Sequence, residues 1–331
     1  MTSTKFGRRS ARVLSTIAVA GSLVGFSSAA FAANVTIPVI VKDATAGYWQ
    51  IVFAGACQAG KDLGVTVPQL GANSEADVNG EITILENAVA GKPAAVVIAP
   101  TQGKALGAPI DAAAKSVPII MIDSGADTTA YTSFLTTNNE NGGKVAADGL
   151  ADSIKAKTGA DKGDIALLTY LPGGASLDAR AKGFKEEIAA KYPDLHIVAD
   201  KVGDGTTATA LNITTDLLTA NPNLVGMFAS NQQTAEAAGQ AVAENKIADK
   251  FSLIGFDSSD KTLGFLDDGT IAGLIVQDPY RMGYDGVKFA LAASKGEKLD
   301  RDVDTGANLV TKANENDAKI SALIHPKLTC K

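Results

Sequence analysis

Few residues of this 331-residue chain could act as nucleophiles, general bases or metal ligands. The two histidines are His196 and His325, and neither lies at a spacing typical of metal ligands. The sequence contains neither a Gly-x-Ser-x-Gly nucleophile elbow nor a Walker A phosphate loop. We therefore expect a protein that is not an enzyme and that holds no metal and no cofactor.

One glycine-rich segment imitates a dinucleotide-binding turn. The pattern G-x-G-x-x-A begins at Gly203, between a predicted strand and a predicted helix. A dinucleotide site would also need an acidic residue at the end of the following strand, but that strand ends in Ser230-Asn231. We interpret the segment as a turn that glycine makes easy, with no bound nucleotide.

Polar side chains gather where the predicted strands end. In open parallel sheets, ligands bind beyond the carboxyl ends of the strands. Two aromatic residues, Tyr48 and Trp49, follow the first strand. Polar groups that bind hydroxyls, together with aromatic faces that cover apolar ring surfaces, suit a sugar-like ligand. The polar residues at or just beyond strand ends are Lys42, Asp43, Asp123, Ser124, Asn231, Gln232, Asp257 and Gln277.

These strand-end residues also have a simpler interpretation. An Asp or Asn between a strand and a helix is often only the N-cap of that helix. Capping could explain any one position, but it explains the whole set poorly. We therefore keep the set as a candidate binding site.

Short apolar runs alternate with helical patterns along the chain. Residues 95–98 and 119–122 are apolar on both faces, which is typical of strands covered by helices on both sides. Repeated strand–helix units predict parallel sheets, and two sheets of five or six strands are more economical than one large sheet. A first crossing between them is expected within residues 133–139. The predicted strands are 35–41, 65–70, 94–99, 118–123, 164–170, 195–202, 224–230, 251–257 and 271–277.

The amino-terminal residues predict export. Four basic residues precede an apolar stretch over about residues 13–26, and small residues lead to Ala32. This pattern is typical of a cleaved signal peptide, which we place at residues 1–32, with an uncleaved anchor as the alternative. Its loss takes the formal net charge from −6 to −10, because four positive charges leave. We expect a periplasmic protein that binds no nucleic acid and does not insert into a membrane after cleavage.

Two cysteines, Cys57 and Cys330, lie near opposite ends of the chain. In an exported protein the oxidising surroundings permit a disulfide between them. A buried thiol together with a free terminal thiol is the alternative. The residues after Thr311 form an extended tail, in which a short helix is predicted to begin at residues 314–317.

Several segments near these residues resemble the ribose-type periplasmic sugar-binding proteins, the receptors of bacterial ABC importers. The resemblance covers nearly all of the chain after residue 32 and is carried by segments 117–123, 211–222, 228–231 and 254–257. It implies an α/β fold of the type I periplasmic binding protein class, with two doubly wound parallel-sheet lobes joined by a three-crossing hinge. The implied lobes are residues 33–138 with 278–304, and residues 139–277 with 305–331.

The same resemblance implies which residues bind the ligand. Asn231, Asp257 and Gln277 match ligand residues of the family's second lobe. In the first lobe, Asp123 matches the family's aspartate, and Tyr48 and Trp49 match its stacking aromatics.

The sequence also departs from the ribose binders. Ser124 and Asp178 stand where those proteins carry arginines, although Arg180 follows two residues later. Receptors of the autoinducer-2 and rhamnose type place a lysine at the end of the first strand and aspartates in both lobes, similar to Lys42, Asp123 and Asp178. A mismatched polar group in such a site changes affinity by about 10⁴. We therefore expect a ligand other than ribose, neutral or amino-substituted, in a negatively charged site.

The resulting prediction is an extracytoplasmic solute-binding receptor of an ABC importer. It would bind a sugar, deoxysugar or polyol in the cleft between the lobes by hinge closure. Its expected partners are this small polyhydroxylated ligand and an ABC permease in the inner membrane, and the protein itself is expected to be a monomer. The alternative is a chemosensory or quorum-signal receptor that binds an autoinducer-2-like ligand or an amino-substituted cyclitol without transport.

Overall fold

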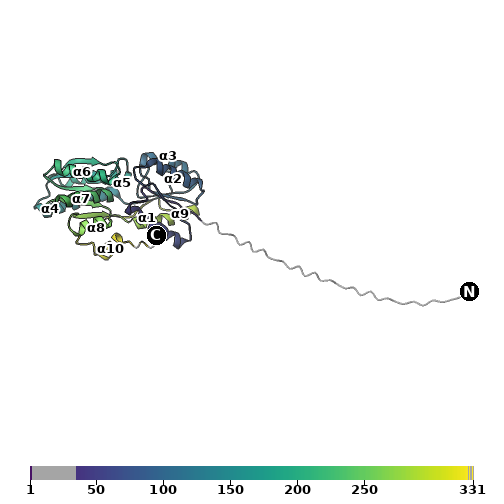
Figure 1. The fold of residues 1–331 in the computed structure, drawn as a ribbon. Coiled ribbons are helices and arrows are strands. Elements are labelled where there is room, and N and C mark those ends of the chain that lie inside the picture. The colour runs from purple at the N-terminus through teal and green to yellow at the C-terminus, as the bar shows by residue number, and fades with distance from the viewer. Residues whose placement is uncertain (2–34, 327, 329, 331) are drawn as a thin grey trace. The chain divides into compact units, whose positions relative to one another are not determined.

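The computed structural model describes Met1, residues 35–326, Leu328 and Cys330. The predicted signal peptide, apart from Met1, lies outside the described residues. Two six-stranded sheets organise residues 35–326 into two α/β lobes, seen in Figure 1 as the group containing α1, α2, α3 and α9 and the group containing α4 to α8. Among the described helices, none combines the length and apolar character that crossing a membrane requires.

The first lobe contains a sheet in which every strand pair is parallel, in the order β11-β5-β4-β3-β1-β2. Helices α1 and α9 cover one face of this sheet, and α2 and α3 cover the other. Side chains on both strand faces are buried, as the continuous apolar runs predict. The elements are β1 (Val39–Val41), α1 (Gly47–Leu63), β2 (Gln69–Gly71), α2 (Val78–Ala90), β3 (Val96–Ile98), α3 (Gly103–Ala113), β4 (Ile119–Ile122), β5 (Ser133–Thr136), α9 (Pro279–Ser294) and β11 (Asp302–Asp304).

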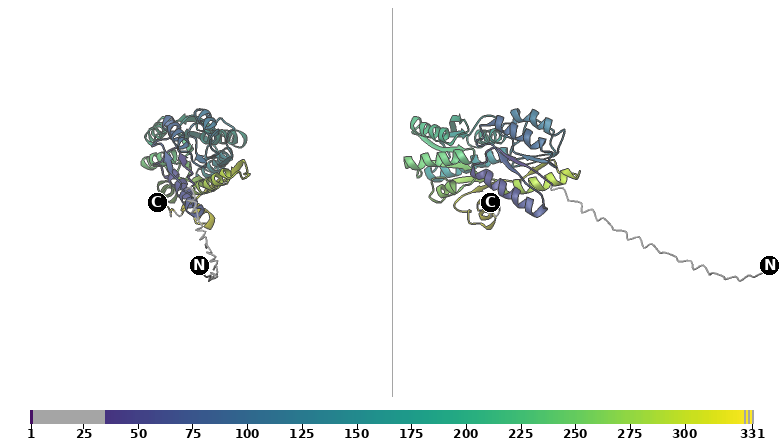
Figure 2. Two further views of the ribbon diagram at one scale, coloured as in Figure 1. Left: turned by 90° about the vertical axis from the view of Figure 1, so that its right-hand side faces the viewer. Right: turned by 45° about the vertical axis from the view of Figure 1, so that its right-hand side comes forward.

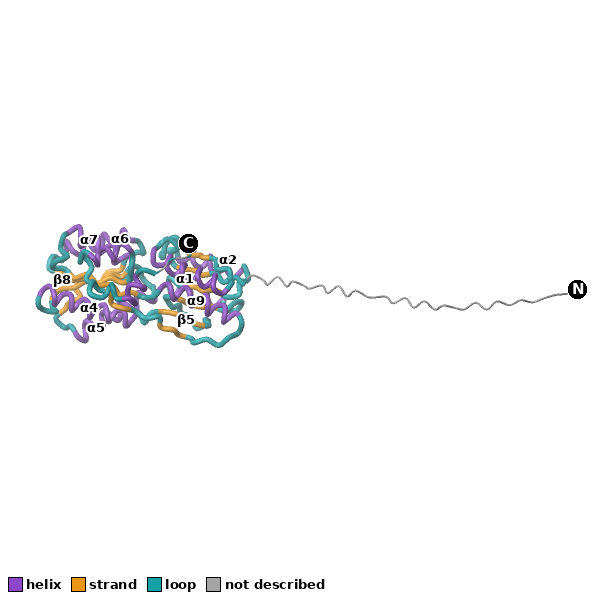
Figure 3. Tube along the Cα trace, turned by 90° about the horizontal axis from the view of Figure 1, so that it is seen from below, coloured by secondary structure: helices purple, strands orange, loops and turns teal. Residues whose placement is uncertain are grey.

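The second lobe contains a sheet of order β12-β10-β9-β8-β6-β7. Helices α4 and α5 pack on one face, and α6, α7 and α8 pack on the other, which Figure 3 shows as purple tubes on the two sides of the orange strands. The elements are α4 (Asn139–Thr158), β6 (Gly163–Thr169), α5 (Ala175–Lys191), β7 (Leu195–Val202), α6 (Thr207–Ala220), β8 (Leu224–Ala229), α7 (Gln232–Asn245), β9 (Ser252–Phe256), α8 (Asp260–Asp267), β10 (Gly273–Val276), β12 (Asn308–Val310) and α10 (Ala318–Ile324).

The chain passes between the two sheets three times: after β5, after β10 and after β11. The last passage is short, and β12 pairs with β10 in antiparallel orientation. The prediction of parallel sheets is therefore correct for every strand except β12. Strands β11 and β12 were not among the predicted strands, and both are only three residues long.

Glycines allow one helix pair in each lobe to approach closely. A side-chain carbon at Gly55 or Gly283 would collide with the backbone of the partner helix, so α1 and α9 touch at these two positions. Gly143 and Gly183 have the same role between α4 and α5. Figure 2 shows α9 in yellow-green beside α1 in purple. These close contacts fix the helices whose first turns face the space between the lobes.

A disulfide joins Cys57 to Cys330, with the two Cα atoms 5.8 Å apart, so the predicted bridge is present. Cys57 lies on α1 in the first lobe. The tail that carries Cys330 packs on the second lobe, because Ile320 and Ile324 of α10 belong to the same buried cluster as Leu266 on α8. The bridge therefore connects the two lobes covalently.

Removing this bridge should lower the stability of the protein. We expect the double variant Cys57→Ser/Cys330→Ser to lose about 2–4 kcal/mol of unfolding free energy, because the unfolded chain regains the freedom that the cross-link removes. Urea unfolding of the oxidised, reduced and variant proteins measures this loss. The reduced protein should match the variant, and equal stability of all three would contradict the expectation.

Candidate ligand-binding site

Two aspartates occupy corresponding positions in the two lobes. Asp123 directly follows β4 and Asp257 directly follows β9, and each backbone N–H bonds the neighbouring strand, at Leu135 O and Ile275 O respectively. Both have a positive φ, 62° for Asp123 and 68° for Asp257. This conformation is uncommon for residues other than glycine, and strained residues cluster at functional sites. The two backbones thus hold buried carboxylates at the carboxyl ends of both sheets.

The first lobe surrounds Asp123 with partners of its own. Lys42 Nζ lies 2.7 Å from Asp123 Oδ2, and the Tyr48 hydroxyl donates to Oδ1 at 3.0 Å. Trp49 packs edge-on against Tyr48 with ring centroids 4.8 Å apart, and its Nε1 donates to Glu75 Oε1 at 3.0 Å. All five side chains are buried. The first lobe therefore presents an aromatic corner with two carboxylates and one ammonium group.

The second lobe surrounds Asp257 in a similar way. Gln277 Nε2 donates to Asp257 Oδ1 at 2.8 Å, and Arg180 Nη1 lies 3.9 Å from Oδ2. The Arg180 guanidinium stacks over the Phe256 ring, 3.6 Å from its centroid. Its Nε donates to Asn139 Oδ1 at 2.8 Å. Arg180 is thus fixed from several sides while it faces the carboxylate.

The two halves meet in one enclosed space. Hydrogen bonds close it from lobe to lobe: Tyr48 N donates to Gln232 Oε1 at 2.8 Å, and the hydroxyls of Ser124 and Ser176 lie 2.8 Å apart. The cavity left between the side chains is about 20 Å³, which is the size of about one water molecule. A larger ligand can enter only if these side chains and the lobes that carry them move apart.

Burial shifts the proton affinities of this cluster. It raises the pKa of Asp257 to about 6, although the nearby Arg180 opposes the change. It also raises the pKa of Glu75, with Lys42 acting in the opposite direction. Burial acts on Asp123 too, but Lys42 and Arg180 outweigh it and hold the pKa of that carboxyl below its usual value. Asp123 is therefore the firmly ionised member of the three acids.

The comparisons with known proteins agree with this geometry. Residues 37–298 match the model of the periplasmic binding protein domain. The chain belongs to this family. It is a solute-binding protein of the kind that serves ABC sugar transporters, so the predicted resemblance, fold class and functional class are confirmed.

Among curated relatives of this binding protein is the D-allose-binding periplasmic protein of Escherichia coli, which is 27% identical over 84% of this chain and 91% of the relative. A ribose import binding protein of Haemophilus influenzae is also 27% identical, over 86% of this chain and 94% of its own length. These relatives are binding proteins, and they favour transport over the alternative of a receptor that only signals.

Two solved structures are similar over most of this binding protein. A carbohydrate transporter solute-binding protein from Agrobacterium radiobacter, in complex with D-arabinose, is 66% identical with a TM-score of 0.88, over 88% of this chain and 99% of that chain. An ABC transporter solute-binding protein from Agrobacterium vitis with bound D-fucose is 34% identical with a TM-score of 0.83, over 88% and 100% of the two chains.

The structure of the binding protein brings most of the predicted site residues together. They line the enclosed cavity from both lobes, and they are Lys42, Tyr48, Trp49, Asp123, Arg180, Asn231, Asp257 and Gln277. Asn231 has two roles, because its side chain also caps α7 by accepting from Thr234 N. The capping interpretation is therefore correct for Asn231, and its role in ligand binding stays a prediction.

Three predicted residues lie at the margin of the cavity without lining it. Asp43 accepts hydrogen bonds from the backbone N–H and hydroxyl of Thr45 and so stabilises a turn. Ser124 accepts from Lys42 Nζ at 2.7 Å and lines a neighbouring groove. Gln232 joins the lobes through its bond to Tyr48 N.

Asp178 is the exception, since the structure does not bring it to the cavity. Residues 176, 177 and 180 of α5 line the cavity, whereas Asp178 is exposed and lines a separate surface groove with Lys182. The reason is helix phase: at about 100° per residue, Asp178 lies about 160° around the helix axis from Arg180 and so points away from the cavity. The prediction that Asp178 supplies the negative charge of the site is therefore wrong, and Glu75 stands in the cavity instead.

Four lining residues were not predicted: Glu75, Ser176, Leu177 and Gln233. Glu75 follows β2, so the rule of strand ends would have found it had the loop after that strand been included. The other three lie in the first turns of α5 and α7. Within the described residues, no three His, Cys, Asp or Glu side chains are arranged to hold a metal ion.

The raised pKa of Asp257 has a measurable consequence for stability. The folded protein holds this proton up to about pH 6, whereas the unfolded chain releases it near pH 4. The unfolding free energy contributed by Asp257 should therefore fall by about 2 kcal/mol as pH rises from 4 to 7. Asp257→Asn should remove this part of the pH dependence and be more stable than the native protein above pH 6.

Urea unfolding of the ligand-free protein at several pH values tests this expectation. Asp216→Asn is the matched control, because Asp216 is exposed on α6. An Asp257→Asn profile that runs parallel to the native profile would show that Asp257 titrates normally.

Proposed function

We propose that this binding protein captures a neutral monosaccharide, with an aldopentose such as D-arabinose as the first candidate, between its two lobes. The observation that carries the proposal is the convergence of Asp123 and Asp257, one from each lobe, on a single enclosed space beside Tyr48 and Trp49. Carboxylates accept hydrogen bonds from sugar hydroxyls, and such charge-assisted bonds contribute about 1.5–3 kcal/mol each. The D-arabinose bound by the Agrobacterium radiobacter relative supports the choice of a pentose.

The charge of the site favours a neutral ligand. Its two cations, Lys42 and Arg180, face three acids, Glu75, Asp123 and Asp257. Lys42 is paired with Asp123, and Arg180 bonds Asn139 and the carbonyl of Ser230. Neither cation is free to bind a phosphate or carboxylate, so phosphorylated and acidic sugars should be excluded.

The proposed mechanism is hinge closure, in which the lobes move as two bodies. We propose that these bodies are residues 33–138 with 278–304 and residues 139–277 with 305–331. A sugar that contacts both lobes stabilises the closed arrangement by its higher affinity for that state. A dissociation constant near 1 μM corresponds to about −8 kcal/mol, which a few charge-assisted bonds and aromatic stacking can supply.

The biological setting follows from the family. We propose that residues 1–32 direct export to the periplasm, and that the closed protein delivers its sugar to an ABC permease in the inner membrane without changing it chemically. The mature protein would need no cofactor for this task.

A panel of sugars tests the ligand class. Thermal unfolding in the presence of D-arabinose, D-fucose, D-ribose and D-allose should show the largest increase in midpoint with D-arabinose, because a ligand at a hundredfold excess over its dissociation constant adds about 2.7 kcal/mol. D-arabinose 5-phosphate is the charged control and should have no effect. The absence of a shift with every neutral sugar would remove the proposal.

Paired substitutions test the site. Asp257→Ala and Trp49→Ala should each weaken D-arabinose binding at least about tenfold, equivalent to about 1.4 kcal/mol, because each removes a buried contact from the cavity. Asp178→Ala is the matched control and should bind normally, since Asp178 is exposed outside the cavity. Calorimetry measures all three. Unchanged affinity in both cavity variants would place the sugar elsewhere.

A further inference from the structure

A second and larger cavity lies beside the hinge. Its volume is about 550 Å³, within the range of small-molecule sites. Four segments line it: Ile51 of α1, residues 278–281 at the start of α9, residues 305–308 after β11, and the tail at and beyond α10. It shares no lining residue with the enclosed cavity of the proposed sugar site. We call it the hinge cavity.

The polar groups of the hinge cavity include an unused hydrogen-bonding group. Thr305 is 8% exposed, and its hydroxyl has no partner among the described residues. A buried hydroxyl without a partner costs free energy unless a ligand or water satisfies it. Asn308 also lines the cavity and adds an amide group to the lining. This cavity therefore has hydrogen-bonding capacity that the protein itself does not use.

Two basic residues and one acidic residue line the hinge cavity. Arg281 and Lys319 line the hinge cavity. Arg281 Nε pairs with Asp285 Oδ2 at 3.1 Å on the same helix, whereas Lys319 forms no ion pair with any other described residue. The first turn of α9 also meets the cavity, and the N-terminal end of a helix attracts anions. Asp278 is the one acid among the lining residues, and its Oδ1 is already used to cap α9 by accepting from Arg281 N at 2.9 Å. Lys319 is therefore the cation of the lining that has no acidic partner among the described residues, and it favours an anionic group.

Apolar side chains complete the lining. Ile51 and Leu323 come from α1 and α10, and Pro279 and Pro326 also line the cavity. A phosphate or sulfate ion would leave these surfaces uncovered. A molecule with both an anionic group and an apolar part would use the whole cavity.

We propose that the hinge cavity is a second binding site, for a small organic carboxylate. The carboxylate would lie near Arg281, Lys319 and the Thr305 hydroxyl, and the apolar part would contact Ile51 and Leu323. This site is independent of the sugar site in its chemistry, because the proposed sugar site favours neutral ligands.

The two sites are connected through the hinge. The hydroxyl of Thr137 lies 2.9 Å from Gln277 Oε1, in the proposed sugar site, and 3.2 Å from the carbonyl of Gly306, which lines the hinge cavity. The next residue after Gln277 is Asp278, which lines the hinge cavity. The walls also come from both lobes, so the shape of the cavity depends on the angle between them. A carboxylate bound with the lobes closed should increase sugar affinity, and the sugar should increase carboxylate affinity by the same factor.

Methyl NMR of the protein with its disulfide intact tests the binding step, with benzoate as the probe. The methyl groups of Ile51 and Leu323 report on the hinge cavity, and those of Leu177 report on the proposed sugar site. Benzoate should shift the Ile51 and Leu323 signals in a saturable manner and leave Leu177 nearly unchanged. Benzyl alcohol, which has the ring without the charge, should bind at least about fivefold more weakly.

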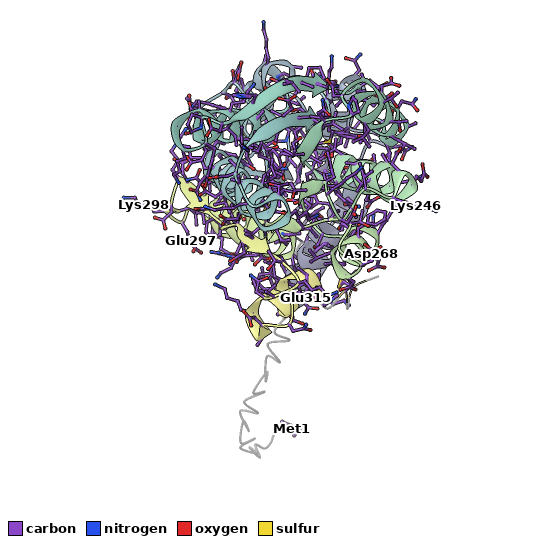
Figure 4. The ribbon with its side chains drawn as sticks, turned by 90° about the vertical axis from the view of Figure 1, so that its left-hand side faces the viewer. Met1, Lys246, Asp268, Glu297, Lys298 and Glu315 are labelled. Carbon is purple, nitrogen blue, oxygen red and sulfur yellow. A yellow bond between two sulfur atoms is a disulfide. The ribbon has the colours of Figure 1, made fainter. Side chains whose placement is uncertain are left out.

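Substitutions locate the site. Arg281→Gln/Lys319→Met should weaken benzoate binding at least about tenfold, and Thr305→Val should weaken it to a smaller extent. Lys298→Met is the control, because Lys298 is exposed away from the hinge cavity and projects outward in Figure 4. Benzoate shifts confined to Leu177, equal binding of benzyl alcohol, or unchanged binding by the double variant would each overturn the proposal.

The coupling has its own measurement. Calorimetry of D-arabinose should give a dissociation constant at least about twofold lower with saturating benzoate than without it, and the Arg281→Gln/Lys319→Met variant should show no such change. An unchanged or higher dissociation constant in the native protein would overturn the coupling, whereas the NMR result decides the site itself even if D-arabinose does not bind.

Discussion

The arrangement depends on burying two carboxylates in one closed space. Moving an ionised group out of water costs several kcal/mol unless a partner compensates it. Each lobe meets this requirement by itself: Lys42 pairs with Asp123 in the first lobe, and Arg180 with Gln277 stabilises Asp257 in the second. Opening the cleft therefore leaves neither carboxylate without its partner. By contrast, the contacts between the lobes include neutral hydrogen bonds, such as Tyr48 N to Gln232, which contribute only about 1 kcal/mol each.

Because the ion pairs lie within each lobe and neutral hydrogen bonds join the lobes, the lobes can separate although the site is strongly polar. If the ion pairs joined the lobes, opening would break buried pairs at a cost of about 3–5 kcal/mol each, and a sugar could hardly enter. Because the pairs lie within the lobes, the closed state is held by weak contacts, to which a sugar can add its own. The left-handed backbone at Asp123 and Asp257 serves the same end, since it directs each carboxylate from a strand end into the space between the lobes.

Much of the fold and of the candidate site could be predicted from the sequence, because the change from apolar to polar residues shows where each strand ends. Buried parallel strands are continuous apolar runs, so the first polar residue after a run marks the functional edge of the sheet. This rule found Lys42, Asp123, Asp257 and Gln277. The family resemblance that suggested Asp178 failed, because side-chain direction on a helix depends on where the helix begins. Gly174 caps α5, and a shift of one residue would have rotated Asp178 by about 100°. Strand β12 could not be predicted either, because three residues are too few to show the periodicity of a strand.

The tail and its disulfide form a covalent link between the two lobes, which bears on the proposed opening and closing of the cleft. Helix α10 packs in the second lobe through Ile320 and Ile324, whereas Cys330 is bonded to Cys57 in the first. From Ile324 to Cys330 the chain has six residue steps, which span at most about 20 Å. The link therefore sets an upper limit on how far Cys57 can move away from α10. A limit of this kind removes conformations from the open ensemble and few from the closed one, because the closed state already satisfies it. For the proposed hinge closure, we expect this limit to lower the entropy of the open state and so to favour closure and the affinity for any ligand that requires it.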